Sequence, residues 1–501
     1  MKLSLFKKDF YSYSITKMYH NCLNFLFLPY FLSANAINNS MFLSKRLTIN
    51  KRYIANCSLT KAIVNKLNFV IIKKVNFFRS LGSVVELVDA PHSKCGTFGY
   101  VGSSPTAPTL MNTYSRFDIS FKKGKGCWLW DKTGKRYLDA VAGIATCSLG
   151  HSDRVLRRRL STQLKKIQHI SNLYNIEEQE QLSRTLTNMS CAKSVFFCNS
   201  GAEANESAIN LIKKYCNTTN KGKESIILAA ESSFHGRTLA ALSATGQPKY
   251  QKGFEPMIQG FKFFKFNNFD SVKKLFEECE NNDQKISGVL VEPIQGEGGV
   301  IPGSKIFFKS LREICDKYNS LLILDEVQSG VGRTGKMWGY ENLGIEPDGF
   351  TLAKGLGGGH AIGALLVKEK ANIFSPGDHA STFGGNPFAC KAALTVLEEI
   401  NRRNLINNVY LRGEQLSAGF EELSKKFPNI ITGKRGLGLI QGLVINDDYA
   451  DAKKITLKAF DKGLLVVPAG GNVVRIVPPL VISRREINIL LDKLNSIFEE
   501  L

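Results

Sequence analysis

Short apolar runs that alternate with helical patterns dominate the chain from Met111 onward. The runs that are typical of buried strands are SVFF at 194–197, SIILA at 225–229, ISGVLVE at 286–292, LLILDE at 321–326 and GFTLA at 349–353. The segments between them carry the apolar period of helices, which indicates βαβ units around a mainly parallel sheet. We therefore expect an α/β fold, in which ligands bind outside the carboxyl ends of the strands.

The net charge of the chain is unevenly distributed. The 501 residues carry a formal net charge of +22, and residues 1–110 hold 14 Lys and Arg against 3 Asp and Glu, a net +11. A strong positive field attracts polyanions, so the charge alone would suggest a nucleic acid or a membrane surface as partner. Because half of it lies in the first fifth of the chain, we expect neither partner for the remainder.

The origin of residues 1–110 allows four interpretations. The apolar run from Cys22 to Ala36 is broken by Pro29 and is too short for a transmembrane helix, and the segment makes a poor targeting peptide because it lacks an early Arg-rich pattern. The stretch from Ser83 to Pro108 resembles a translated transfer-RNA gene. We therefore expect residues 1–110 to be upstream sequence and the native start to be Met111. If they are native, the alternative is a non-catalytic basic protein that associates with RNA or membranes.

Cysteine usage bears on the compartment. Eleven cysteines are scattered along the chain without CxxC pairs or the Cys/His spacing of a zinc site. This pattern favours reduced thiols over a disulfide framework. We expect a cytoplasmic protein without a structural metal.

The segment from Gly330 to Gly335 matches GxGxxG and nearly matches a P-loop. A dinucleotide fingerprint needs its first glycine directly at the strand end, and a P-loop needs Ser or Thr after the lysine, where this chain has Met337. Both nucleotide interpretations therefore fail on context. Asp325, at the end of the preceding strand, is the stronger indication of a ligand.

Lys354 follows the next strand, 29 residues after Asp325, and enters a glycine-rich turn. A surface lysine beside a flexible loop would show the same pattern. Partial burial at a strand end would lower the pKa of the amine and make it nucleophilic. Pyridoxal phosphate (PLP) uses such a lysine to form an imine, together with a carboxylate that keeps the pyridine nitrogen protonated. The pair therefore predicts a PLP site.

Two earlier strand ends supply the other parts that this cofactor needs. Gly201 and Ala202 open a helix, whose N-terminal N–H groups and dipole bind phosphate. Phe234 can stack on the ring and Arg237 can bind a carboxylate. His235, between them, could act as a base, although a lone histidine beside an aromatic residue is more often packed with its hydrogen bonds satisfied.

With these features in place, the chain from about Met111 to Leu501 resembles the class-III, fold-type-I PLP aminotransferases. The resemblance rests on GCWLWDKTGKRYLDAVAGIA, NSGAEANE, FHGRT, EPIQGEGGV, LDEVQSGVGRTG, AKGLGGG and STFGGNP. It implies a large PLP-binding domain with a mainly parallel sheet over residues 166–388. It also implies a smaller α+β domain built from both terminal segments, 111–165 and 389–501.

The resemblance also implies roles for individual residues. Those that would contact the cofactor are Lys354 as the imine lysine, Asp325 at the pyridine nitrogen, Gln328 at the phenolic oxygen, Gly201 and Ala202 at the phosphate, Phe234 on the ring, and Thr382 at the phosphate of the neighbouring subunit of a homodimer. Those that would contact substrates are Arg237, Ser381 and the gate pair of Glu297 and Arg475, which opens for 2-oxoglutarate.

The substrate expected from the resemblance is N2-acetylornithine, whose terminal amine would pass to 2-oxoglutarate during arginine biosynthesis. Free-ornithine transaminases of this class place a tyrosine where this chain has Ile144, and an apolar residue suits an acetylated amine. Succinyldiaminopimelate, ornithine and GABA-type ω-amines remain alternatives. The chain departs from the family pattern at GHSDR, 150–154, and at His360 and Ala361, which puts fine positioning in doubt.

Overall fold

A seven-stranded sheet organises the larger part of the protein. The computed structural model describes residues 110–220 and 222–501, so the predictions for the upstream segment lie outside the described residues, Leu110 excepted. The strand order is β4 (Ser194–Cys198), β12 (Gly363–Val367), β11 (Gly349–Leu352), β10 (Leu321–Asp325), β7 (Gln284–Val291), β5 (Glu224–Ala230) and β6 (Phe261–Phe264). Six strands of this sheet run in the same direction, and β12 runs opposite to them, antiparallel to β11 and β4. The predicted mainly parallel sheet is confirmed, whereas β6 and β12 were not predicted.

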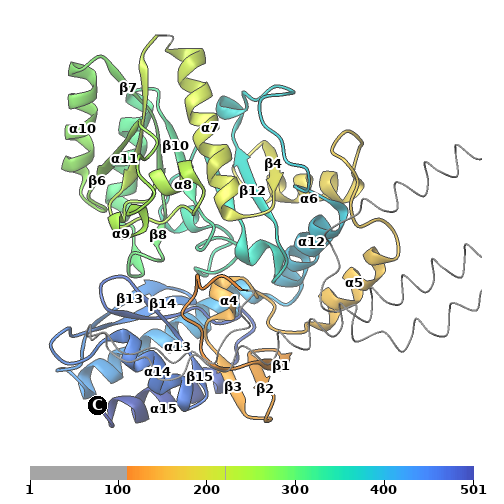
Figure 1. The fold of residues 1–501 in the computed structure, drawn as a ribbon, viewed down its shortest axis with the longest axis vertical. Coiled ribbons are helices and arrows are strands. Elements are labelled where there is room, and N and C mark those ends of the chain that lie inside the picture. The colour runs from red at the N-terminus through yellow and green to blue at the C-terminus, as the bar shows by residue number, and fades with distance from the viewer. Residues whose placement is uncertain (1–109, 221) are drawn as a thin grey trace, which may run out of the picture. The chain divides into compact units, whose positions relative to one another are not determined.

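Helices cover both faces of this sheet (Figure 1). Successive side chains of a strand point to opposite faces, so Leu321 and Ile323 of β10 pack in the apolar cluster of α7 (Gly201–Thr219). Leu322 and Leu324 pack in the cluster that includes α10 (Phe269–Asn281) and α11 (Lys305–Lys317). A strand buried on both faces reads as an unbroken apolar run, which is how β10 could be found in the sequence.

The two terminal segments build the smaller part together. β1 (Phe121–Lys125), β2 (Trp128–Asp131) and β3 (Arg136–Asp139) form an antiparallel meander, and β15 (Leu464–Leu465) pairs with β3 in parallel. Figure 1 shows these orange strands beside the blue C-terminal elements. A second sheet has the order β13 (Ile431–Leu437), β14 (Ile440–Ile445), β17 (Val473–Ile476) and β16 (Val467–Ala469). The small part built from both terminal segments is confirmed, and the exact domain limits stay a prediction.

The remaining elements connect and cover these sheets. The last helix, α15 (Arg484–Phe498), begins with a capping box of Ser483 and Glu486 and buries an apolar stripe of Ile487, Leu490, Leu494 and Ile497. The others are α4 (Ala142–Ala145), α5 (Arg154–Leu164), α6 (Glu177–Asn188), α8 (Leu239–Ser243), α9 (Pro248–Gln251), α12 (Pro387–Arg402), α13 (Leu405–Lys426), α14 (Ala452–Asp461), the strands β8 (Ile294–Gln295) and β9 (Ile301–Pro302), and the 3₁₀ turns η2 (Gly339–Asn342), η3 (Lys354–Gly357) and η4 (Glu369–Ala371).

Three further observations apply to the described residues alone. None of their helices is both long enough and apolar enough to cross a membrane. No group of three or more His, Cys, Asp or Glu side chains among them is arranged to hold a metal ion. The eight cysteines within this part of the chain are free thiols.

Candidate active site

Four strand ends meet at one cavity of about 500 Å³. Gly201 follows β4, Phe234 follows β5, Asp325 is the last residue of β10, and Lys354 follows β11. All four line the cavity. They are brought together because the carboxyl ends of these strands lie at the same edge of the sheet. Of the other predicted site residues, Ala202, Arg237, Gln328 and Glu297 also line it.

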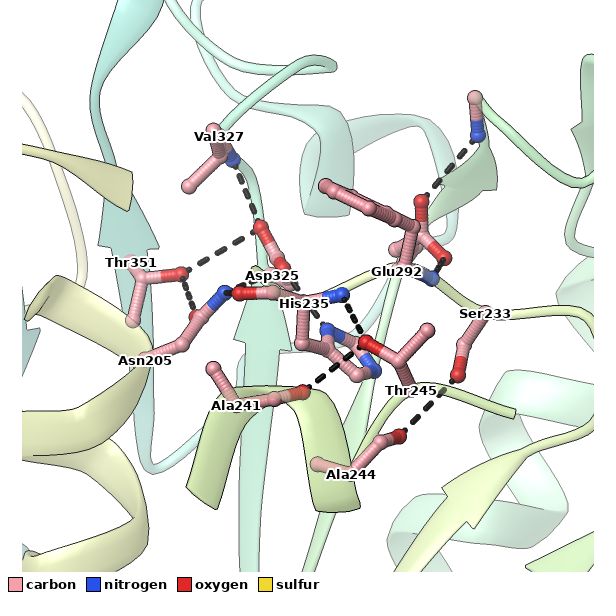
Figure 2. Close-up of polar contacts among 12 residues, drawn as sticks. Asn205, Ser233, His235, Ala241, Ala244, Thr245, Glu292, Asp325, Val327 and Thr351 are labelled. Atoms are coloured by element: carbon pink, nitrogen blue, oxygen red, sulfur yellow. Dashed lines mark hydrogen bonds and ion pairs between the residues drawn. The ribbon is translucent and has the colours of Figure 1, made fainter. Parts of the chain in front are cut away.

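Asp325 is held by a dense set of hydrogen bonds (Figure 2). Its Oδ2 accepts from Asn205 Nδ2 at 2.7 Å and lies 2.8 Å from Nδ1 of His235, while its Oδ1 accepts from the backbone N–H of Val327 at 3.0 Å. Thr351 on β11 donates to Asn205 Oδ1 at 2.8 Å. The carboxylate is 4% exposed. It is therefore fixed in position and can serve as a localised negative charge facing the cavity.

The hydrogen bonding of His235 differs from what its sequence context predicts. Its Nδ1 is bonded to Asp325, but its Nε2 is buried and has no hydrogen-bond partner within residues 110–220 and 222–501. The expectation of a packed histidine with satisfied hydrogen bonds is thus wrong for one of its two nitrogens. Because Nδ1 faces a carboxylate, we assign the ring proton to Nδ1, so that His235 donates a hydrogen bond to Asp325 and helps to fix its orientation.

Lys354 is placed by an unusual backbone. Its φ of 40° lies in the left-handed region, which is strained for a residue with a side chain and is common at functional sites. Burial lowers the pKa of the amine, against the opposing influence of the carboxylates of Glu297 and Asp325. A lysine of lowered pKa has more of its neutral, nucleophilic form near neutral pH.

The start of α7 lies at one end of the cavity, where its free N–H groups are suited to an anion. Ser200 caps the helix by accepting from the N–H of Glu203 at 3.2 Å, and the first intrahelical bond runs from Ala204 to Ser200. The N–H groups of Gly201 and Ala202 precede that bond, as expected for the first turn of a helix. A Cβ on Gly201 would lie 2.7 Å from a methyl of Val327, so only glycine lets the helix end approach the loop after β10.

Aromatic packing holds the two predicted residues after β5. The Arg237 guanidinium carbon lies 4.1 Å from the ring centroid of Tyr250 and 5.6 Å from that of Phe234. The rings of Phe234 and Tyr250 meet edge to face at 5.7 Å. Tyr250 was not predicted, since nothing in its local sequence indicates a ring that faces a residue 13 positions earlier.

Glu297 and Arg475 form an ion pair at the border of the two parts of the fold. Arg475 Nη1 lies 2.6 Å from Glu297 Oε1 and donates to Gln328 Oε1 at 3.0 Å. Burial alone would raise the pKa of Glu297, but the charge and hydrogen bond of Arg475 hold it below its ordinary value. Because Arg475 only donates, the amide oxygen of Gln328 must face it, which turns the Gln328 amide nitrogen away from Arg475.

Glu292 is a cavity residue that sequence reasoning missed. It follows β7, so the strand-end argument that found Asp325 could have found it. Its carboxylate accepts from the N–H groups of Phe234 and Gly296, each at 3.2 Å. Burial, with the nearby charge of Asp325, raises its pKa to about 7.

Four of the predicted positions do not line the cavity: Arg475, which reaches it only through Glu297 and Gln328, and Ser381, Thr382 and Ile144. Ser381 does not line the cavity but accepts a hydrogen bond from Asn199, which does, at 3.2 Å, and Thr382 is exposed. Ile144 is 39% exposed and is not among the lining residues, whereas Thr146 is. Within a single chain, Ile144 is therefore not placed to contact the acetylated amine of the substrate. The departing residues His360 and Ala361 both line the cavity.

The chemistry of the lining fits PLP part by part. N–H groups at a helix start suit the phosphate, the buried Asp325 suits a protonated ring nitrogen, and Phe234 suits the ring face. The Lys354 amine of lowered pKa suits the aldehyde carbon. The volume is that of an ordinary small-molecule site. The role of each residue toward the cofactor stays a prediction.

Comparisons with known proteins agree with this site. Residues 110–498 match the family model described as aminotransferase class-III. A curated acetylornithine aminotransferase of Prochlorococcus marinus subsp. pastoris is 82% identical over 415 residues, which cover 83% of this chain and 100% of that protein. Another, from Nostoc sp., is 48% identical over 423 residues, which cover 83% of this chain and 98% of that protein.

Solved structures give a second comparison. The N-acetylornithine aminotransferase of Stenotrophomonas maltophilia superposes with a TM-score of 0.67 at 34% identity, covering 77% of this chain and 97% of that one. The ornithine aminotransferase of Toxoplasma gondii superposes with a TM-score of 0.74 at 28% identity, covering 78% and 93%.

Proposed function

The chain belongs to the class-III aminotransferase family, and we propose that it transfers the terminal amino group of N2-acetyl-L-ornithine to 2-oxoglutarate. The products are N-acetyl-L-glutamate 5-semialdehyde and L-glutamate, as arginine biosynthesis requires. The observation that carries the proposal is the convergence of Lys354 and Asp325 on one cavity, in a chain 82% identical to an acetylornithine aminotransferase.

The cofactor of the reaction is PLP, which supplies an electron sink for the bonds broken at the substrate carbon. Lys354 would hold it covalently through Nζ, and the same amine, when free, would serve as general base and acid toward the substrate carbon. Asp325 keeps the ring nitrogen protonated, and Gln328 donates its amide N–H to the phenolic oxygen. Gly201 and Ala202 bind the phosphate.

Two arginines divide the recognition of carboxylates between them. Arg237 binds the α-carboxylate of the substrate, with Ser381 beside it. Arg475 is held by Glu297 until a dicarboxylate enters. This arrangement lets one site accept first an amine with a single carboxylate and then 2-oxoglutarate. Arg475 can bind the second carboxylate of 2-oxoglutarate only when its ion pair with Glu297 breaks.

The native assembly we propose is a homodimer with shared sites, in which Thr382 reaches the phosphate bound by the other subunit. Its exposure in the single chain supports this role. A cytoplasmic location is also proposed, supported by the free thiols. Sedimentation of the purified protein tests the dimer, and a monomer with full activity would contradict it.

The substrate assignment is tested by comparing kcat/KM for N2-acetyl-L-ornithine, N-succinyldiaminopimelate and L-ornithine at saturating 2-oxoglutarate. We expect the acetylated substrate to give the highest value. Ornithine is the second candidate, because an ornithine aminotransferase is among the similar solved structures. A higher kcat/KM for ornithine or the succinylated substrate would overturn the assignment while leaving the aminotransferase chemistry intact.

A further inference from the structure

Arg237, which lines the cavity, and Arg475, which contacts the lining residues Glu297 and Gln328, are held by different chemistry. Arg475 is paired with the carboxylate of Glu297. Arg237 has no carboxylate partner among residues 110–220 and 222–501, and instead its guanidinium lies over the ring of Tyr250 at 4.1 Å. A carboxylate occupies the N–H groups of a guanidinium, whereas an aromatic face attracts its charge and leaves those groups free.

Tyr250 is itself anchored to the loop that carries Arg237. Tyr250 lies in the short helix α9, which Gln247 precedes and Gln251 ends. Gln247 donates through Nε2 to the carbonyls of Ser232 and Ser233 at 3.2 and 3.0 Å. Gln251 donates to the carbonyls of Leu242 and Thr245 at 3.2 and 3.0 Å. The ring therefore has a fixed place relative to the loop.

We propose that Tyr250 is a positioning residue that sets specificity for the carboxylate of the amino donor. Its ring holds Arg237 in the cavity with an unoccupied N–H fork, so that the carboxylate binds without displacing an internal anion. Arg237 is then available in both half-reactions, in contrast to Arg475. This inference rests on the proposed function, in which Arg237 binds that carboxylate.

The test separates the carboxylate from the rest of the substrate. N-Acetylputrescine is the decarboxylated counterpart of N2-acetyl-L-ornithine, so the ratio of the two kcat/KM values reports what the carboxylate contributes. For Tyr250→Leu we expect this ratio to fall about tenfold, with kcat/KM for N-acetylputrescine nearly unchanged. Tyr250→Phe keeps the aromatic face and should keep the ratio. An equal loss with both substrates, or no loss, would overturn the inference.

Binding without turnover gives a second readout. N2-Acetyl-L-norvaline has the same carboxylate and acetyl group but no terminal amine. Calorimetric titration of the PLP-loaded full-length protein should give a Kd about tenfold higher for Tyr250→Leu than for the wild type, and a similar Kd for Tyr250→Phe. Lys249→Ala is the matched control, since the Lys249 ammonium lies 4.8 Å from the same ring but is exposed and does not line the cavity.

A shape-preserving series keeps the proposal falsifiable if Tyr250→Leu does not fold. Phenylalanine with increasing fluorine substitution, introduced at position 250, weakens the negative ring face stepwise without changing the packing greatly. We expect the Kd for N2-acetyl-L-norvaline to rise with each fluorine, and a flat series would overturn the inference. A wild-type protein that does not discriminate N2-acetyl-L-ornithine from N-acetylputrescine would instead overturn the proposed function.

Discussion

Arg475 Nη1 lies 2.6 Å from Glu297 Oε1, and the Arg475 side chain is fully buried. Glu297 comes from the loop after β8 and Arg475 from β17, so the pair joins the large sheet region to the C-terminal segment. A buried arginine whose partner is removed is an uncompensated charge. We therefore expect the pair to contribute to stability and, by the proposed function, to the choice between a substrate with one carboxylate and a substrate with two.

Replacing Glu297 should separate these two contributions. In Glu297→Gln, 2-oxoglutarate no longer has to displace an anion, so we expect its KM to fall several-fold. The cofactor-free protein should lose up to about 3 kcal/mol of unfolding free energy because Arg475 is left unpaired. Steady-state kinetics and urea unfolding measure the two effects. Glu346→Gln, which breaks an exposed pair with Lys368, is the control and should change neither; an unchanged KM in Glu297→Gln would contradict the gate.

Gly201 should be required for cofactor binding. The new Cβ of Gly201→Ala would lie 2.7 Å from Val327, so the helix start must move away from the loop after β10. We expect the Kd for PLP to rise about tenfold and stability to fall by about 1–3 kcal/mol. Gly433→Ala is the matched control, because a Cβ there meets nothing within 4 Å. Equal PLP affinity in both variants would argue against a phosphate site at this helix start.

Glu326 should make stability fall as pH rises. Burial raises its pKa from 4.5 to about 8, so between these values the native state binds more protons than the unfolded state. The unfolding free energy should then decrease by up to about 1.4 kcal/mol per pH unit in that window. Urea unfolding of the cofactor-free protein from pH 5 to 8 measures this slope. Glu326→Gln should be less stable at low pH, where it loses a hydrogen bond to the N–H of Gly339 or Tyr340, and should show a shallower slope. Equal slopes would contradict the raised pKa.

Local sequence patterns could predict the strand ends but not the contacts between them. Asp325 and Lys354 follow apolar runs that are buried on both faces, and the sheet brings such ends to one edge. Asn205 binds Asp325 from 120 positions away, and this contact depends on where α7 crosses the sheet. The direction of a strand could not be predicted either, because the apolar composition of β12 would be the same in a parallel and in an antiparallel strand.

Backbone conformation explains why Ile144 does not line the cavity of the single chain. Ala142, Gly143, Ile144 and Ala145 all have positive φ, from 53° to 64°, a left-handed turn that costs roughly 1–2 kcal/mol for each residue other than the glycine. Asp139 stabilises its start by accepting from the N–H groups of Val141 and Ala142 at 2.9 Å each. No propensity predicts such a turn, and it brings Thr146 to the cavity in place of Ile144.

The absorbance spectrum of the full-length protein with PLP tests the central claim most directly, namely that Lys354 and Asp325 hold the cofactor in a working transaminase site. The wild type should show the band of lysine-bound cofactor, lose it on addition of N2-acetyl-L-ornithine and regain it with 2-oxoglutarate, while Lys354→Ala should never show it. A folded wild-type protein without that band, or with a band that both substrates leave unchanged, would contradict the account.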